Sequence, residues 1–119
     1  LSGEIGAGKT TFARFFLSAL GVAEEVPSPT FNLVFVYETN IAPVWHFDFY
    51  RLSDLREVYE LGFEDALDQG VTLIEWPQRI CSLLPNHRID ITISIGFSER
   101  RNVVITGSGD MEKELLEHL

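Results

Sequence analysis

The stretch GEIGAGKT, residues 3–10, constrains the fold of this chain more than any other part of the sequence. It satisfies the pattern G-x-x-x-x-G-K-[ST], which is typical of a phosphate-binding loop between a strand and a helix. The glycines let successive backbone N–H groups curl around phosphate oxygens, and the N-terminal end of the following helix adds positive potential. In this pattern the lysine reaches the β- and γ-phosphates, and the threonine hydroxyl binds magnesium. We therefore expect a nucleotide to be bound by Gly3, Glu4, Ile5, Gly6, Ala7, Gly8, Lys9, Thr10 and Thr11.

The residues after this loop predict the helix that such a site requires. Five apolar side chains follow helical spacing and form one stripe, which we expect in the core: Phe12, Phe15, Phe16, Ala19 and Leu20. Gly21 is well placed to end the helix. The alternative is a glycine-rich turn ahead of an amphipathic helix, and it leaves Lys9 and Thr10 without a role.

Helical and strand patterns alternate along the rest of the chain. Alternating apolar residues predict strands over residues 31–38 and 44–52, which we expect to form a hairpin. Further strands are expected over residues 71–75, 88–96 and 102–107, and helices over residues 53–62, 63–70, 76–85 and 110–119. This order of elements predicts a single α/β domain over residues 1–119 with a mixed sheet, partly parallel and partly antiparallel.

Composition narrows the class of protein. Nine Lys and Arg against 18 Asp and Glu give a net charge of −9, which disfavours direct, tight binding of nucleic acid. Cys81 is the only cysteine, so an internal disulfide and a Cys-rich metal site are excluded, and we expect this side chain to pack inside its helix. The absence of a long apolar run and of a signal peptide favours a cytoplasmic protein that is not inserted in a membrane.

Two carboxylates are candidates for binding the metal and for orienting an attacking water molecule. Glu75 ends the predicted strand 71–75, where a Walker-B acid usually stands; the alternative is an exposed glutamate at a strand end. Asp48 lies in an aromatic strand, where a charged carboxylate is costly unless it is paired or bound to metal. The alternatives for Asp48 are an ion pair with Arg51 or hydrogen bonds to backbone. We expect Lys9, Asp48 and Glu75 to be catalytic, and Thr10, Asp48 and Glu75 to hold Mg²⁺.

Three further residues have competing interpretations. Thr30 follows Ser-Pro and suits a switch-like threonine that touches metal or γ-phosphate, or simply a hydroxyl at the start of a strand. Trp76 can stack on a base or a partner, although core packing is the commoner fate of tryptophan. His46 shares a strand face with Asp48, and we favour a buried, hydrogen-bonded histidine over a catalytic base.

Several motifs together resemble a known family. GEIGAGKTTF, SPTF, HFDFYRL, LGFEDAL and LIEWPQRI, followed by LLP, are similar to the bacterial TsaE (YjeE) ATPases. The phosphate loop alone is generic, but this combination in this order is specific, and the similarity runs from Gly3 to about Ile95.

The resemblance implies a fold, a reaction and partners. Family members have a small P-loop NTPase-like fold, here expected in three layers, and a weak ATPase activity alone. They take part in making threonylcarbamoyladenosine in tRNA by binding the complex of the TsaD and TsaB proteins, which ATP hydrolysis resets between turnovers. Contact with tRNA would then be indirect. By the same resemblance, Thr30 is the switch residue and Trp76 lies beside the nucleotide or the partner.

The resemblance also sets an expectation about the beginning of the chain. Relatives carry a helix and a strand, roughly 25–30 residues, before the loop, and this chain has only Leu1 and Ser2 there. We therefore expect a truncated N-terminus. Two other functions remain open: a small P-loop kinase acting on a metabolite, and a non-catalytic adaptor gated by nucleotide.

Overall fold

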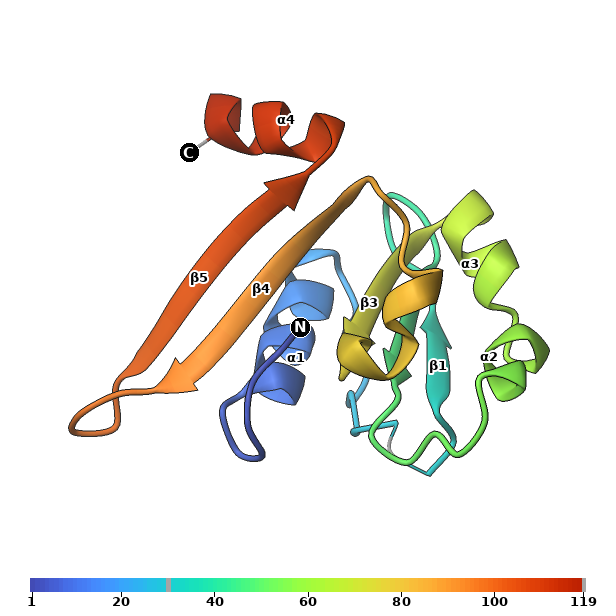
Figure 1. Ribbon diagram of the computed structural model, residues 1–119, viewed down its shortest axis with the longest axis horizontal. Helices are drawn as coiled ribbons and strands as arrows, with labels where there is room; N and C mark the ends of the chain where they lie inside the picture. Colours follow the sequence, from blue (N-terminus) through green and yellow to red (C-terminus); the bar gives the residue numbers. More distant parts are fainter. Residues whose placement is uncertain (30, 119) are drawn as a thin grey trace.

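The computed structural model describes residues 1–29 and 31–118 and shows the predicted α/β fold (Figure 1). Its central sheet has three strands in the order β1 (Val34–Tyr37), β2 (Val44–Asp48) and β3 (Val71–Glu75). The first two form the predicted antiparallel hairpin, whereas β2 and β3 run parallel. The sheet is therefore mixed, as the sequence predicts, and the parallel pair brings the carboxyl ends of β2 and β3 to the same edge.

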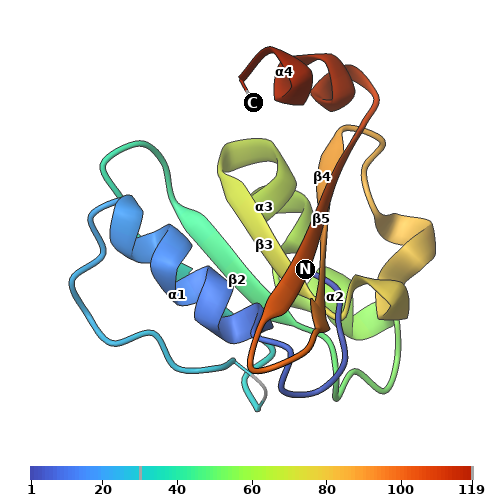
Figure 2. The same ribbon diagram turned by 90° about the vertical axis from the view of Figure 1, so that its left-hand side faces the viewer.

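Helices cover both faces of this sheet and make the three predicted layers (Figure 2). On one face, α1 (Lys9–Ala19) packs its Ala13 and Leu17 against Val44 and Leu73 of the sheet. The opposite face is covered by α2 (Arg56–Glu60), α3 (Phe63–Gln69) and the 3₁₀ helix η1 (Pro77–Leu83). The second core consists of Phe47, Phe49, Val58, Phe63, Ala66 and Ile80.

The last part of the chain forms a second, two-stranded sheet. An antiparallel pair, β4 (Arg88–Ile95) and β5 (Arg101–Ser108), is followed by α4 (Asp110–His118). Figure 1 shows this hairpin beside the mixed sheet, with α4 at its end. Among the described residues, no helix combines the length and apolar character needed to cross a membrane.

The first two residues lie between the two sheets. Ser2 forms a parallel bridge with β4: its N–H donates to the Ile91 carbonyl, and its own carbonyl accepts from the Ile93 N–H, both at 2.8 Å. The Leu1 amino group donates to the carbonyl of Ile74 in β3 at 2.7 Å. The segment that leads into the phosphate loop is thus held by both sheets, which fixes where the loop begins.

The packing predictions were wrong for Phe15, Ala19 and Cys81. The buried face of α1 consists of Lys9, Ala13 and Leu17, and Phe15 is 74% exposed. Phe12, Phe16 and Leu20 are partly buried and pack against the core, as predicted. Cys81 is exposed as well, because Ile80 takes the buried position in η1.

Two element boundaries also differ from prediction. Phe31 lies outside β1, since Leu33 has a φ of 67° and breaks the strand before Val34. The helix expected over residues 53–62 is confined to Arg56–Glu60. Ser53 does not cap it: the Ser53 hydroxyl instead donates to the carboxylate of Glu57, within the first turn of the helix, at 3.0 Å.

Candidate phosphate-binding site

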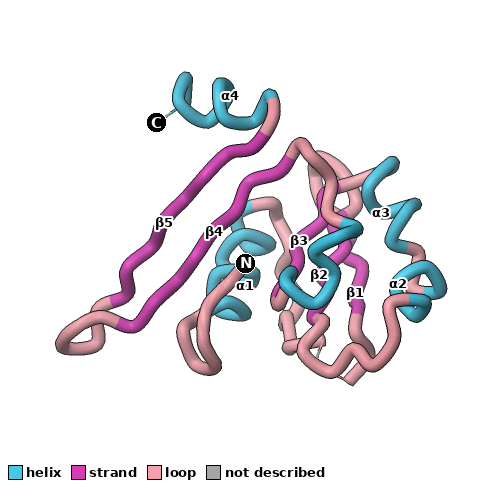
Figure 3. The backbone as a smooth tube through the Cα atoms, in the orientation of Figure 1, coloured by secondary structure: helices cyan, strands magenta, loops and turns pink. Residues whose placement is uncertain are grey.

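The loop of residues 3–8 connects the bridge at Ser2 to the first turn of α1 (Figure 3). Gly8 has a φ of 113°, a conformation that favours glycine. Gly3 passes so close to β4 that a Cβ atom there would meet the Ile93 carbonyl oxygen. The first N–H groups of α1 have no acceptor within the helix, so the loop and the helix start form a site suited to an anion.

Lys9 is held inside this loop. Its side chain is 6% exposed, and Nζ donates to the carbonyls of Gly3 at 2.7 Å and of Glu4 at 2.9 Å. The ammonium also lies 4.4 Å from the centroid of the Trp76 ring, a cation–π contact. Burial lowers the pKa of Lys9, and the nearby carboxylates of Glu75, Asp48 and Glu4 oppose that shift. The lysine is therefore a buried cation stabilised by neutral acceptors, which a phosphate can replace.

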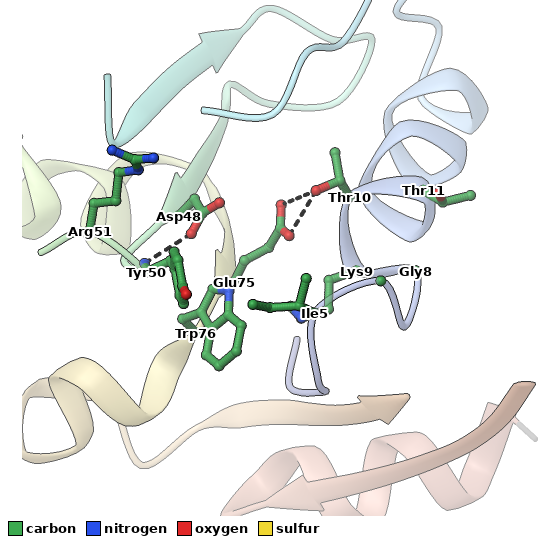
Figure 4. Close-up of a pocket in the computed structure, with 11 residues that line it drawn as sticks. Ile5, Gly8, Lys9, Thr10, Thr11, Asp48, Tyr50, Arg51, Glu75 and Trp76 are labelled. Carbon is green, nitrogen blue, oxygen red and sulfur yellow. Dashed lines mark hydrogen bonds between the residues drawn. The ribbon is translucent and has the colours of Figure 1, made fainter. Parts of the chain in front are cut away.

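Glu75 lies at the end of β3, and its carboxylate is directed at α1. The residue is 2% exposed, so the alternative of an exposed strand-end glutamate is wrong. The Thr10 hydroxyl donates to Oε1 at 2.9 Å and to Oε2 at 3.0 Å (Figure 4). Nε2 of the fully buried His46 lies 2.7 Å from Oε2. A direct hydrogen bond between Thr10 and Glu75 thus joins the first turn of α1 to the end of β3.

Asp48 ends β2 and is paired in register with Glu75 on β3. It is buried, and its Oδ1 accepts a hydrogen bond from the Tyr50 N–H at 3.0 Å. Its Oδ2 lies 3.4 Å from the Ser28 hydroxyl, in the segment that precedes Pro29. Asp48 therefore makes the backbone hydrogen bond that the alternative interpretation expects. It also lies beside Glu75 on the neighbouring strand.

A cleft of about 390 Å³ opens over these groups, which is within the usual size range for a small-ligand pocket. The residues that line it come from the loop, from α1 and from the ends of β2 and β3 (Figure 4): Ile5, Gly6, Gly8, Lys9, Thr10, Thr11, Asp48, Tyr50, Arg51, Glu75 and Trp76. Most of the predicted site is therefore brought together in one place.

The remaining predicted residues are placed differently. Gly3, Glu4 and Ala7 shape the loop but do not line the cleft; Gly3 and Glu4 contribute the carbonyls that bind Lys9. Thr11 lines the cleft, with an exposed side chain that points away from Glu75 (Figure 4). Thr30 lies outside the described residues.

Three residues at or near the cleft were not predicted to belong to the site. Tyr50 packs against Trp76 with ring centroids 4.9 Å apart, so the two rings form one wall. Arg51 lines the cleft with its guanidinium 4.6 Å from the Phe31 ring, and Figure 4 shows it on the far side of Asp48 from Thr10. Arg101 of β5 donates to the Ala7 carbonyl at 3.0 Å and anchors the loop. Tyr50 and Arg51 come directly after Asp48 in the sequence, and this position could have indicated that they lie near the site. No sequence pattern indicates a contact of Arg101 with the loop.

The sequence matches a family model over residues 1–103, described as "Threonylcarbamoyl adenosine biosynthesis protein TsaE". The chain belongs to the TsaE family. This confirms the resemblance carried by the loop, SPTF, HFDFYRL and LIEWP motifs.

Individual relatives agree with the family match. The tRNA threonylcarbamoyladenosine biosynthesis protein TsaE of Bacillus subtilis is 38% identical over 120 residues, covering 100% of this chain and 75% of the relative. That of Rickettsia felis is 37% identical, covering 100% of this chain and 70% of the relative. The crystal structure of Bacillus subtilis YdiB superposes with a TM-score of 0.78 at 32% identity, over 98% of this chain and 72% of that one. This member of the TsaE family therefore shares its fold with a solved structure.

Proposed function

We propose that this protein binds and hydrolyses ATP in the biosynthesis of threonylcarbamoyladenosine in tRNA. The observation that carries the proposal is the direct hydrogen bond between the loop threonine, Thr10, and the strand-end carboxylate, Glu75, beside a buried lysine. A P-loop enzyme needs these three groups together for phosphate, metal and water. The relatives named above carry the tRNA modification in their names, and this supports the pathway.

Nucleotide binding is expected to begin with an exchange of partners at Lys9. Its ammonium is held by two carbonyls and one aromatic ring. A phosphate oxygen is a stronger acceptor for an ammonium than a neutral carbonyl, because the hydrogen bond is charge-assisted. The loop amides and the start of α1 add further donors, and Trp76 with Tyr50 offers an aromatic wall for the rest of the nucleotide.

The donor set at the cleft fits Mg²⁺. Magnesium prefers oxygen ligands and usually binds through one or two carboxylates together with substrate phosphates. Thr10, Glu75 and Asp48 supply only oxygens, and the described residues contain no cluster of three or more His, Cys, Asp or Glu that could enclose a metal. Thr10, Glu75 and Asp48 would hold the ion, which supplies charge stabilisation to the transferring phosphoryl group.

The chain's own residues then support in-line attack of water on the γ-phosphate. Glu75 or Asp48 accepts a hydrogen bond from the water and orients it, since both carboxylates face the cleft. Lys9 and the loop amides stabilise the negative charge on the phosphate oxygens. The products are ADP and inorganic phosphate, which distinguishes this reaction from transfer to a metabolite by a kinase.

The partners follow from the family resemblance and from the charge of the chain. We propose that the protein acts on the complex of TsaD and TsaB, which carries out the carbamoyl transfer, and that ATP hydrolysis resets this complex. A net charge of −9 suits an indirect role, because tight binding of tRNA requires a basic surface. The partner complex, and not this chain, would then hold the tRNA.

Thermal unfolding with and without Mg-ATP tests the nucleotide site. Ligand at 100 times its dissociation constant should raise the free energy of unfolding by about 2.7 kcal/mol. The Lys9→Ala variant should lose this stabilisation because it lacks the cation that meets the phosphates. Lys113→Ala removes the only other lysine, on the exposed face of α4, and should respond like wild type. An unchanged unfolding curve for wild type at saturating Mg-ATP would refute nucleotide binding.

A further inference from the structure

His46 is the one fully buried histidine of the described chain, and it lies directly behind the Glu75 carboxylate. Its Nε2 is 2.7 Å from Glu75 Oε2. The two residues are two positions apart in the β2–β3 register, on the face that α1 covers, since His46 is paired with Leu73 and Glu75 with Asp48. The contact therefore joins two neighbouring strands underneath the cleft.

The hydrogen bonding of the imidazole fixes its tautomer. Nδ1 is buried and has no hydrogen-bond partner among the described residues. A buried N–H without an acceptor is a costly arrangement, so the proton is better placed on Nε2, where it meets a carboxylate. In this tautomer Nε2–H donates to Oε2, and Nδ1 keeps only a lone pair.

Glu75 consequently receives hydrogen bonds from two sides. Thr10 reaches it from α1 and His46 from β2. In the proposed function the Thr10 hydroxyl also binds the metal of the nucleotide. His46 is fully buried and does not line the cleft, so it does not contact the ligand. The His46 contact is therefore the one that keeps Glu75 in place during the reaction.

We propose that His46 is a positioning residue for Glu75, acting through an Nε2–H donor to the carboxylate. This inference rests on the proposed hydrolysis of ATP and adds a role outside the cleft. Partners that orient a carboxylate or a metal ligand from behind typically contribute about 10- to 100-fold to activity or metal affinity. We expect His46 to affect turnover and to leave nucleotide binding nearly unchanged.

The test compares His46→Gln with His46→Phe. Gln places an amide N–H near the position of Nε2 and should retain most of the turnover, whereas Phe fills the space without a donor and should lose about 10- to 100-fold in kcat. KM and the dissociation constant for ATP should stay close to wild type in both. Equal losses in both variants, or no loss in either, would overturn the proposal. If the Phe variant does not fold, His46→Asn replaces it, because its shorter amide does not reach Glu75.

A second measurement is independent of hydrolysis. The chain has three histidines, so ¹⁵N spectra of the nucleotide-free protein resolve the ring nitrogens, and His46→Gln assigns the signals that disappear. The proposal predicts a protonated Nε2 and an unprotonated Nδ1 for His46. A proton on Nδ1 would overturn it. If the wild-type protein fails to hydrolyse ATP while the tautomer is as expected, the proposed function fails and the hydrogen bond to Glu75 stands.

Discussion

At the residue scale, the contact between Lys9 and Trp76 links the loop to the end of β3. The ammonium lies over the indole ring at 4.4 Å and is bound to two loop carbonyls. Trp76 adopts a left-handed backbone conformation with a φ of 59°, uncommon for a bulky residue, and this conformation turns the chain from β3 into η1. A movement of Lys9 towards a phosphate would change the surroundings of this indole.

Tryptophan fluorescence measures that movement. Trp45 is the only other tryptophan, and it packs against the core on the face opposite α1. In a Trp45→Phe background, titration with Mg-ATP should change the emission of Trp76 in a saturable way, because the cation leaves the ring. In a Trp76→Phe background the emission of Trp45 should stay constant. The reverse pattern, with Trp45 responding and Trp76 silent, would contradict the placement of the nucleotide.

The sequence predicted most of the residues that line the cleft, and it missed the contacts between them. The loop pattern predicts a nucleotide-binding role for Lys9 and Thr10, and the position of Glu75 at a strand end predicts a metal-binding or catalytic role; these roles stay predictions. His46 and Glu75 are 29 positions apart in the sequence, and their contact depends on the register between β2 and β3. No local pattern contains that register, so a buried histidine was expected but its partner was not.

At the element scale, the type of each helix and strand could be predicted, whereas the face that each one buries was less certain. The period of apolar residues identified α1, but two adjacent stripes on this helix are apolar. The sheet selected the stripe with the small Ala13 and left Phe15 in solvent. Packing between α1 and the sheet determines which face of the helix is buried, and the sequence of the helix alone does not determine it.

The burial of β2 leads to a stability prediction. Phe47 is fully buried on the face opposite α1, with its ring centroid 5.3 Å from that of Phe49 and 5.5 Å from that of Phe63. Phe47→Ala should lower the free energy of unfolding by about 3–5 kcal/mol, because it removes a large buried side chain and leaves a cavity. Phe15→Ala deletes the same atoms from an exposed position and should stay within about 0.5 kcal/mol of wild type. Chemical denaturation measures both, and similar losses in the two variants would contradict the assigned core.

At the scale of the whole molecule, the phosphate loop is held by parts of the chain that are distant in sequence. Ser2 is bridged to β4, and Arg101 of β5 binds the Ala7 carbonyl 94 residues away. Sequence patterns predicted β4 and β5 as strands but not their position beside the loop, since that position depends on contacts between sheets. The C-terminal hairpin therefore holds the loop in place, and none of its residues lines the cleft.

The charge of the molecule belongs to the same scale. With 18 acidic against nine basic side chains, the net charge disfavours direct, tight binding of a polyanion such as tRNA. The proposed division of labour, in which this chain hydrolyses ATP and the TsaD–TsaB complex holds the tRNA, is consistent with that charge.

Glu75 is proposed to serve hydrolysis of the ATP that the loop holds. Phosphate release by wild type and Glu75→Gln, measured with and without the TsaD–TsaB complex, tests it most directly. Glu75→Gln keeps the size of the side chain and removes its charge, so turnover should fall by about 10²–10⁴-fold, the usual contribution of a group that accepts a proton from or orients the attacking water. Its affinity for ATP should remain measurable. Full partner-stimulated turnover by Glu75→Gln would rule out this role of Glu75 and would favour a nucleotide-gated adaptor.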